Sequence, residues 1–67
     1  MKFSDFVKQI EDTNIVIYKD FTCYRNGHKF DTCCIDQTSR TVLFISFNSI
    51  EHAYNRLCRN YNLKSSI

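Results

Sequence analysis

The dipeptide Asn26-Gly27 is the feature that most constrains the fold of this sequence. It contains the only glycine of a 67-residue chain that has no proline, and both of its residues tolerate the positive φ angles of a type I′ turn. The segment before it, residues 14–24, is rich in β-branched and aromatic side chains. These features predict an antiparallel hairpin with Asn26-Gly27 as its two-residue loop, which places Arg25 opposite His28.

A second turn extends the hairpin into a meander. Counting away from the first loop pairs Cys23 with Phe30. The polar residues 37–40 then lead into residues 41–47, and closing this loop with four residues pairs Phe30 with Phe47. We therefore predict three antiparallel strands.

Side-chain alternation sorts the strand residues onto two faces, since successive residues of a strand point to opposite sides. Both turns, placed independently, gather apolar side chains on the same face, and only Lys19 does not fit there. The expected core face consists of Ile15, Ile17, Phe21, Cys23, Phe30, Cys34, Leu43, Ile45 and Phe47.

One helix is expected before the meander in the sequence and one after it. Ser4 can cap a first helix that runs to about residue 12, and Asn48 with Glu51 has the capping-box spacing of a second helix over residues 49–61. Because three strands span only about 14 Å, two helices would fill one face. The predicted fold is α+β, one domain over residues 1–67 in the order helix, three-stranded antiparallel meander, helix (αβββα), with both helices on one sheet face.

Composition excludes several classes. The 43% hydrophobic content favours a packed core over disorder, and a net charge of +2 is too small to imply a polyanionic partner by itself. The N-terminal segment is polar by its fourth residue, and the apolar run at residues 42–45 is far shorter than the ~20 residues of a membrane helix. We therefore expect a soluble, reduced, cytoplasmic protein without a membrane partner.

The cysteines suggest a metal site that the register argues against. Cys23, His28 and Cys33 form C-x3-G-H-x4-C, which resembles the last three ligands of a retroviral-type zinc knuckle, but Asp20 stands where a knuckle has its first cysteine. The hairpin also directs Cys33 away from Cys23 and His28. Cys23 and Cys34 share a face yet lie on the order of 13 Å apart, too far for a disulfide. We expect free thiols, no metal and no cofactor.

No combination of nucleophile, base and orienting group is visible, and the one glycine is taken by the turn. His28 and His52 are expected at the surface. The chain is therefore predicted not to be an enzyme.

Nucleic-acid binding is the alternative function. Aromatic and basic residues together can stack bases and hold phosphates, and such residues occur near the hairpin tip and on the second helix. Against this interpretation, Arg56 and Arg59 also complement the negative C-terminal end of the second helix. Asp20, Asp31 and Asp36 add negative charge to the hairpin that carries the other basic residues. The candidate nucleic-acid-binding residues are Tyr24, Arg25, Lys29, Arg56 and Arg59.

The sheet face away from the helices is the leading candidate site. An apolar centre with a polar margin is the anatomy of an interface, unless one helix crosses over and makes this face ordinary core. The strand at residues 41–47 contains no proline or charge, so its free edge would promote aggregation unless another segment pairs with it. A partner strand, or a second copy in a homodimer, would supply that pairing. The predicted protein-binding residues are Tyr18, Cys33, Ile35, Val42 and Phe44.

The sequence thus predicts a small non-enzymatic interaction protein that acts by protein–protein binding. Its most specific form is a phage or mobile-element inhibitor of a host defence or nucleic-acid-handling complex, of the anti-CRISPR or anti-restriction type. This form depends on small size and on a composition typical of AT-rich coding sequences, because Phe, Ile, Lys, Asn and Tyr total 28 residues while Gly, Ala and Pro total two.

Overall fold

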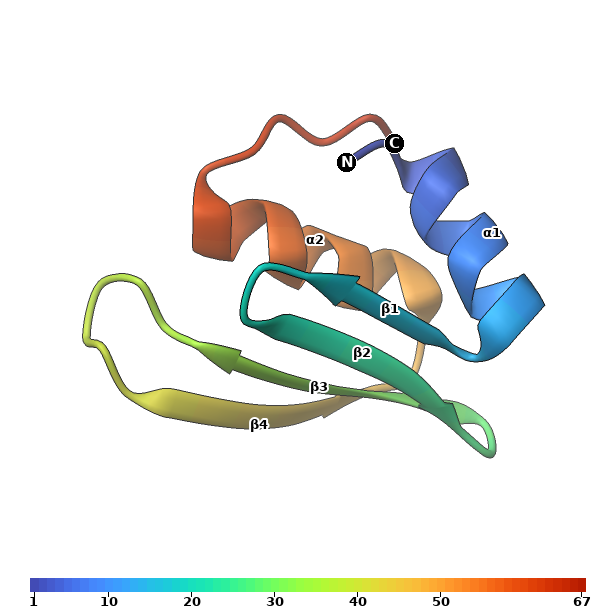
Figure 1. The fold of residues 1–67 in the computed structure, drawn as a ribbon, viewed down its shortest axis with the longest axis horizontal. Coiled ribbons are helices and arrows are strands. Elements are labelled where there is room, and N and C mark those ends of the chain that lie inside the picture. Colours follow the sequence, from blue (N-terminus) through green and yellow to red (C-terminus); the bar gives the residue numbers. More distant parts are fainter.

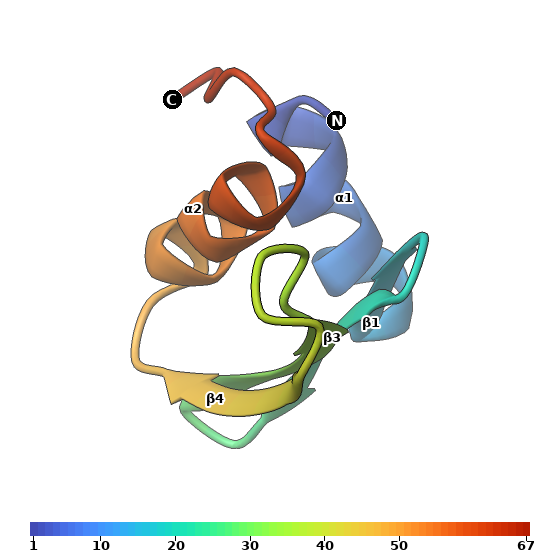
Figure 2. The ribbon, with the colours of Figure 1, turned by 90° about the vertical axis from the view of Figure 1, so that its left-hand side faces the viewer.

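The computed structural model describes residues 1–67, which form two helices and one four-stranded antiparallel sheet. The elements are α1 (Phe3–Thr13), β1 (Ile15–Tyr18), β2 (Phe21–Asn26), β3 (Lys29–Ile35), β4 (Val42–Phe47) and α2 (Ile50–Tyr61). The strands pair in chain order, so β1 and β4 are the sheet edges. Figures 1 and 2 show both helices on one side of the sheet. The α+β class is therefore confirmed, whereas the prediction of three strands is wrong.

The additional strand arises because residues 14–24 are not one strand. The chain reverses at Lys19-Asp20, so that Tyr18 pairs with Phe21 and Val16 with Cys23. Lys19 takes up the reversal with a φ of 52° in the left-handed region. A two-residue turn places Tyr18 and Phe21 on the same face, whereas a continuous strand would place them on opposite faces.

The first hairpin is also shifted from its predicted register. Its loop is Gly27-His28, so that Asn26 pairs with Lys29 and Cys23 with Thr32. Gly27 has a φ of 63° and His28 is not in the positive-φ region, an arrangement that fits a type II′ turn with glycine first rather than the type I′ turn predicted. Because the shift is two residues, each β2 and β3 side chain keeps its predicted face.

The β3–β4 register is confirmed. Phe30 pairs with Phe47 and Cys34 with Leu43. The Asp36 backbone N–H donates to the Thr41 carbonyl at 2.8 Å, and the Asp36 carboxylate accepts the Thr38 and Ser39 N–H groups at 2.8 and 3.0 Å. These hydrogen bonds fix the conformation of the loop between β3 and β4, and thereby the register of β4.

The core lies between the sheet and the two helices. Val16 is the buried residue of β1, while Ile15 and Ile17, which were predicted as core, are 37% and 62% exposed because the new turn reverses the alternation of β1. Tyr54 of α2 is fully buried, and its hydroxyl donates to the Met1 carbonyl at 2.6 Å. The buried apolar residues are Phe6, Ile10, Val16, Phe21, Cys23, Cys34, Ala53, Tyr54, Leu57 and Cys58.

The helix starts differ slightly from prediction. α1 begins after Lys2, which makes no side-chain cap, so Ser4 lies within the helix rather than capping it. In α2 the cap is Ser49, whose hydroxyl accepts the His52 N–H at 3.2 Å. The two terminal segments are in contact, since the Phe3 N–H donates to Ser66 Oγ at 2.7 Å. Neither helix combines the length and the apolar character that crossing a membrane requires.

Candidate protein-binding surface

The sheet has an uncovered face, which we call the outer face, opposite the side on which α1 and α2 pack (Figure 2). One row across all four strands consists of Ile17, Thr22, Cys33 and Phe44, and the next row consists of Ile15, Tyr24, Asp31 and Ser46. Phe44 is 78% exposed and Val42 is 57% exposed. Large apolar side chains are normally scattered on a surface, so their concentration on one face makes the outer face the candidate interaction site.

Four of the five predicted protein-binding residues lie on the outer face. Val42 and Phe44 are exposed, and Cys33 and Ile35 are half-buried beside them. The fifth, Tyr18, is wrongly placed by the prediction: its ring packs on the Tyr61 ring, on the helix side, at a centroid distance of 5.3 Å. Its predicted position depended on the continuous strand that the Lys19-Asp20 turn interrupts.

Sequence reasoning missed two residues of this face, Ile15 and Ile17. Both were predicted as core, but they belong to the outer face and are exposed, whereas Tyr24 is exposed on the face that the predicted register gave it. The available signal for Ile15 and Ile17 is the polar pair Lys19-Asp20, which interrupts an apolar run and permits a turn that puts residues 15–18 in the other alternation frame.

A polar margin borders the apolar row. The Asp31 carboxylate accepts hydrogen bonds from Ser46 Oγ and from Asn26 Nδ2, the latter at 2.8 Å. The Ser46 and Asn26 hydrogen bonds, together with the nearby Lys29 ammonium, hold the pKa of Asp31 below its ordinary value. Tyr24, Cys33 and Phe44 join these groups around a shallow hollow. The outer face thus offers apolar contact beside a fixed negative charge.

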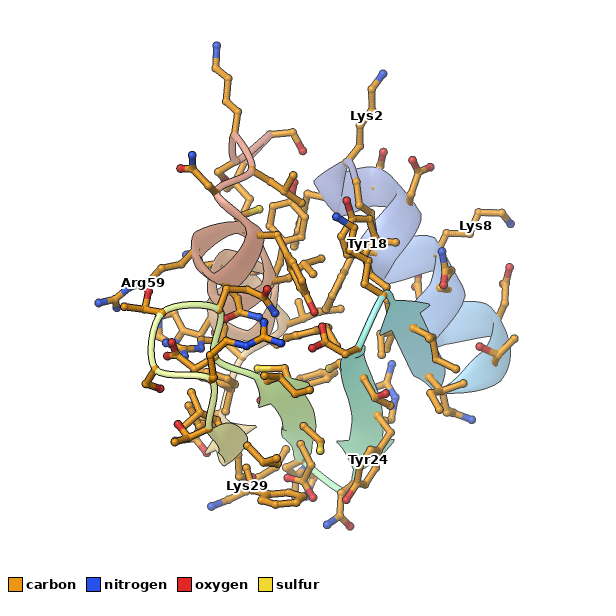
Figure 3. All side chains as sticks on the ribbon, turned by 60° about the vertical axis from the view of Figure 1, so that its left-hand side comes forward. Lys2, Lys8, Tyr18, Tyr24, Lys29 and Arg59 are labelled. Carbon is orange, nitrogen blue, oxygen red and sulfur yellow. The ribbon has the colours of Figure 1, made fainter.

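The five predicted nucleic-acid-binding residues are not brought together. Tyr24 lies on the outer face, whereas the Arg25 guanidinium lies over the Phe30 ring at 5.4 Å, on the helix side. Figure 3 shows Tyr24 and Lys29 at the hairpin end of the sheet and Arg59 extending from α2. Asp31 adds negative charge between Tyr24 and Lys29, on the face that these two residues share. The arrangement is not a continuous basic surface.

Two of the predicted basic residues belong to a separate depression, which we call the α2–β4 groove. Arg56 is partly buried and donates to the Asp36 carboxylate at 3.2 Å, while its Nε is buried without an acceptor. Arg59 forms no ion pair. The groove is lined by Ile45, Phe47, His52, Asn55, Arg56 and Arg59.

The thiols lie on both sides of the sheet. Cys23 is buried on the helix side and Cys33 is half-buried on the outer face, so the knuckle-like cysteines point away from each other, as the register predicted. Burial, with a smaller contribution from the Asp31 charge, raises the pKa of Cys23 to about 11. This thiol is therefore protonated at neutral pH and is not an activated nucleophile.

Comparison with known proteins gives no match to this chain: no family model, no curated protein and no solved structure is significantly similar to it.

Proposed function

We propose that this protein is a non-enzymatic binding protein that captures another protein through its outer face and acts by occluding that partner's surface. The observation that carries the proposal is the row formed by Ile17, Cys33 and Phe44, which neither helix covers. Burying a side chain such as Phe44 in an interface removes apolar area from water, which stabilises the complex by about 25 cal/mol for each Å² buried. The polar margin around Asp31 would set the orientation of the partner.

Size limits how such a partner sits. A stable interface buries about 800 Å² on each protein, roughly a fifth of the 4448 Å² of accessible surface here. The molecule measures only 31 × 24 × 18 Å. A contact of this size therefore extends past the outer face onto an edge of the sheet.

The most specific form of this proposal is a phage or mobile-element inhibitor of a host defence or nucleic-acid-handling complex, of the anti-CRISPR or anti-restriction type. What supports this form is the small size of the chain and its AT-rich-like composition. Inhibition by occlusion requires only that the surface binds its target, without catalysis.

Capture by the wild-type protein and by two variants, Phe44→Asp and Ile17→Asp, tests the outer face. Both positions are exposed, so the melting temperatures should stay close to wild type while the captured partner is lost. Gln9→Asp, at an exposed position of α1, is the matched control and should retain the partner. Capture that survives both outer-face variants would contradict the proposal.

Nucleic-acid binding is the second candidate, and the cations of the α2–β4 groove favour it. Binding of this kind weakens steeply with salt because each phosphate contact releases counterions. A titration of labelled single- and double-stranded oligonucleotides at low and moderate salt separates the two functions. Absence of binding at low salt removes this candidate.

A further inference from the structure

The free edge of β4 presents unpaired backbone groups. The hydrogen bond from Asp36 N–H to the Thr41 carbonyl identifies that pair as a hydrogen-bonded one, and in an antiparallel ladder such pairs recur at every second residue. The backbone groups of Val42, Phe44 and Ser46 therefore point away from β3. β4 is an edge strand, so no neighbour pairs with these groups. Such an edge is a template for one more strand.

The two sides of this edge differ in chemistry. On the outer face, Val42 and Phe44 are exposed and apolar. On the helix side, the edge borders the α2–β4 groove, whose lining includes His52, Arg56 and Arg59. A strand added to β4 alternates its side chains between these two surroundings. Residues opposite Val42, Phe44 and Ser46 would contact the outer face, and the residues between them would enter the groove.

The α2–β4 groove is lined by two arginines and by no acidic residue. Arg59 takes part in neither of the two ion pairs of the structure. Arg56 is paired through Nη2 with Asp36. A carboxylate is the acceptor that an arginine binds best, and the exposed Arg59 guanidinium has none.

We propose that β4 takes up an extended segment of the partner protein in which apolar and acidic residues alternate, the acidic ones entering the α2–β4 groove. This inference rests on the proposed function, because it names the segment through which the captured protein extends past the outer face. The main-chain hydrogen bonds supply affinity, and the two side-chain rows supply specificity.

A second copy of this chain does not fit the groove as well. Residues 41–47 contain no acidic residue, so pairing β4 with its own copy would send Leu43, Ile45 and Phe47 to the helix side and leave Arg59 without an anionic partner. It would also bring two sets of groove arginines toward one another. Charge complementarity therefore favours a foreign acidic strand over a homodimer.

Synthetic peptides test the charge requirement. The probes are two capped, fluorescent nonapeptides, one alternating valine with glutamate and the other alternating valine with lysine, titrated by anisotropy with the full chain at low salt. The glutamate peptide should bind at least tenfold more tightly. Arg59→Glu should reverse this preference, whereas Lys64→Glu, which changes net charge equally at an exposed site outside the groove, should not. Equal binding of the two peptides, or no detectable binding of either, would overturn the inference.

N-methylation tests the strand geometry without altering the protein. When the peptide pairs antiparallel to β4, the residues opposite Val42, Phe44 and Ser46 point their N–H groups at β4. Methylating the valine nitrogens then removes these donors and should abolish binding, while methylating the glutamate nitrogens, which face away, should leave affinity within about threefold. Equal effects of the two methylation patterns would contradict strand addition.

Three outcomes separate this inference from its alternatives. A single-stranded oligonucleotide that binds more tightly than the glutamate peptide and is lost with Arg59→Glu would make the groove a nucleic-acid site. A concentration-dependent dimer that the glutamate peptide fails to dissociate would assign the β4 edge to a second copy. Partner capture abolished by Phe44→Asp but unaffected by Arg59→Glu would overturn this inference and leave the proposed function standing.

Discussion

Tyr18 packs edge-to-face on Tyr61, with the ring centroids 5.3 Å apart and the ring planes at 69°. Lys19 Nζ lies 5.4 Å from the centroid of the Tyr61 ring and 5.6 Å from that of Tyr18. This cluster joins the end of β1 to the last turn of α2, and Figure 3 places Tyr18 beside the helices. Tyr18, which directly follows the exposed Ile17, thus lies at the margin of the core.

Tyr18→Ala should destabilise the protein by about 1–3 kcal/mol, because it removes a ring from a packed aromatic contact. For a domain of this size, each kcal/mol lowers the melting temperature by roughly 4–8 °C. Ile17→Ala, at the neighbouring position on the outer face, is the control and should change stability by no more than about 0.5 kcal/mol. Thermal and urea unfolding followed by circular dichroism measure both. Equal losses for the two variants would show that the alternation of β1 is described wrongly.

Native alkylation should modify Cys33 first. Cys33 is half-buried on the outer face, whereas Cys23, Cys34 and Cys58 are at most 5% exposed. Burial raises the pKa of Cys23 to about 11 and also raises that of Cys34, where the Arg56 guanidinium partly opposes the effect. Since the thiolate is the nucleophile, these thiols react only when the structure opens.

Iodoacetamide at about pH 8 with mass spectrometry measures this order. One fast modification is expected, and Cys33→Ser should eliminate it. A bound partner on the outer face should protect Cys33 as well. Two or more fast thiols in the wild-type protein would be inconsistent with the described core.

Acid should destabilise the protein through Asp31 and Asp36. Hydrogen bonds from the Ser39 and Thr38 N–H groups, followed by the Arg56 charge, hold the pKa of Asp36 below 3.8, and the Asp31 pKa is likewise lowered. A carboxyl group with a depressed folded-state pKa takes up its proton less readily than in the unfolded chain. Its stabilisation is therefore complete above the unfolded pKa and is lost as the pH falls through the folded one.

Urea midpoints between about pH 6 and about pH 2 should therefore decline below about pH 4. Asp36→Asn and Asp31→Asn should each lower the midpoint at neutral pH and flatten the decline in acid. Lys8 and Asp12 form an exposed pair on α1, so Asp12→Asn is a control that should leave the slope nearly unchanged. A slope that neither variant alters would assign acid sensitivity to other groups.

The sequence by itself determined the second half of the fold. Asp36 directs its own turn through side-chain hydrogen bonds, and the resulting pairing of Asp36 with Thr41 sends Leu43, Ile45 and Phe47 to the helix side, so the β3–β4 register followed from local chemistry. The second helix was predicted to within one residue at its start. Because Cys33, Ile35, Val42 and Phe44 depend on this half alone, their placement on the outer face was also predictable.

Tertiary packing decided the first half. Residues 15–18 are apolar at every position, so both alternation frames offer a plausible core row, and local chemistry does not choose between Ile15 with Ile17 and Val16 with Tyr18. The helices make that choice: Val16 is buried in the cluster that includes Phe6 and Ile10 of α1, and Tyr18 packs on Tyr61 of α2. Likewise, the spacings of four and three residues between His52, Arg56 and Arg59 put them on one helical face, but only the packing of α2 over the sheet aligned that face with the free edge of β4. The outer face and the groove beside it are therefore properties of how the elements pack.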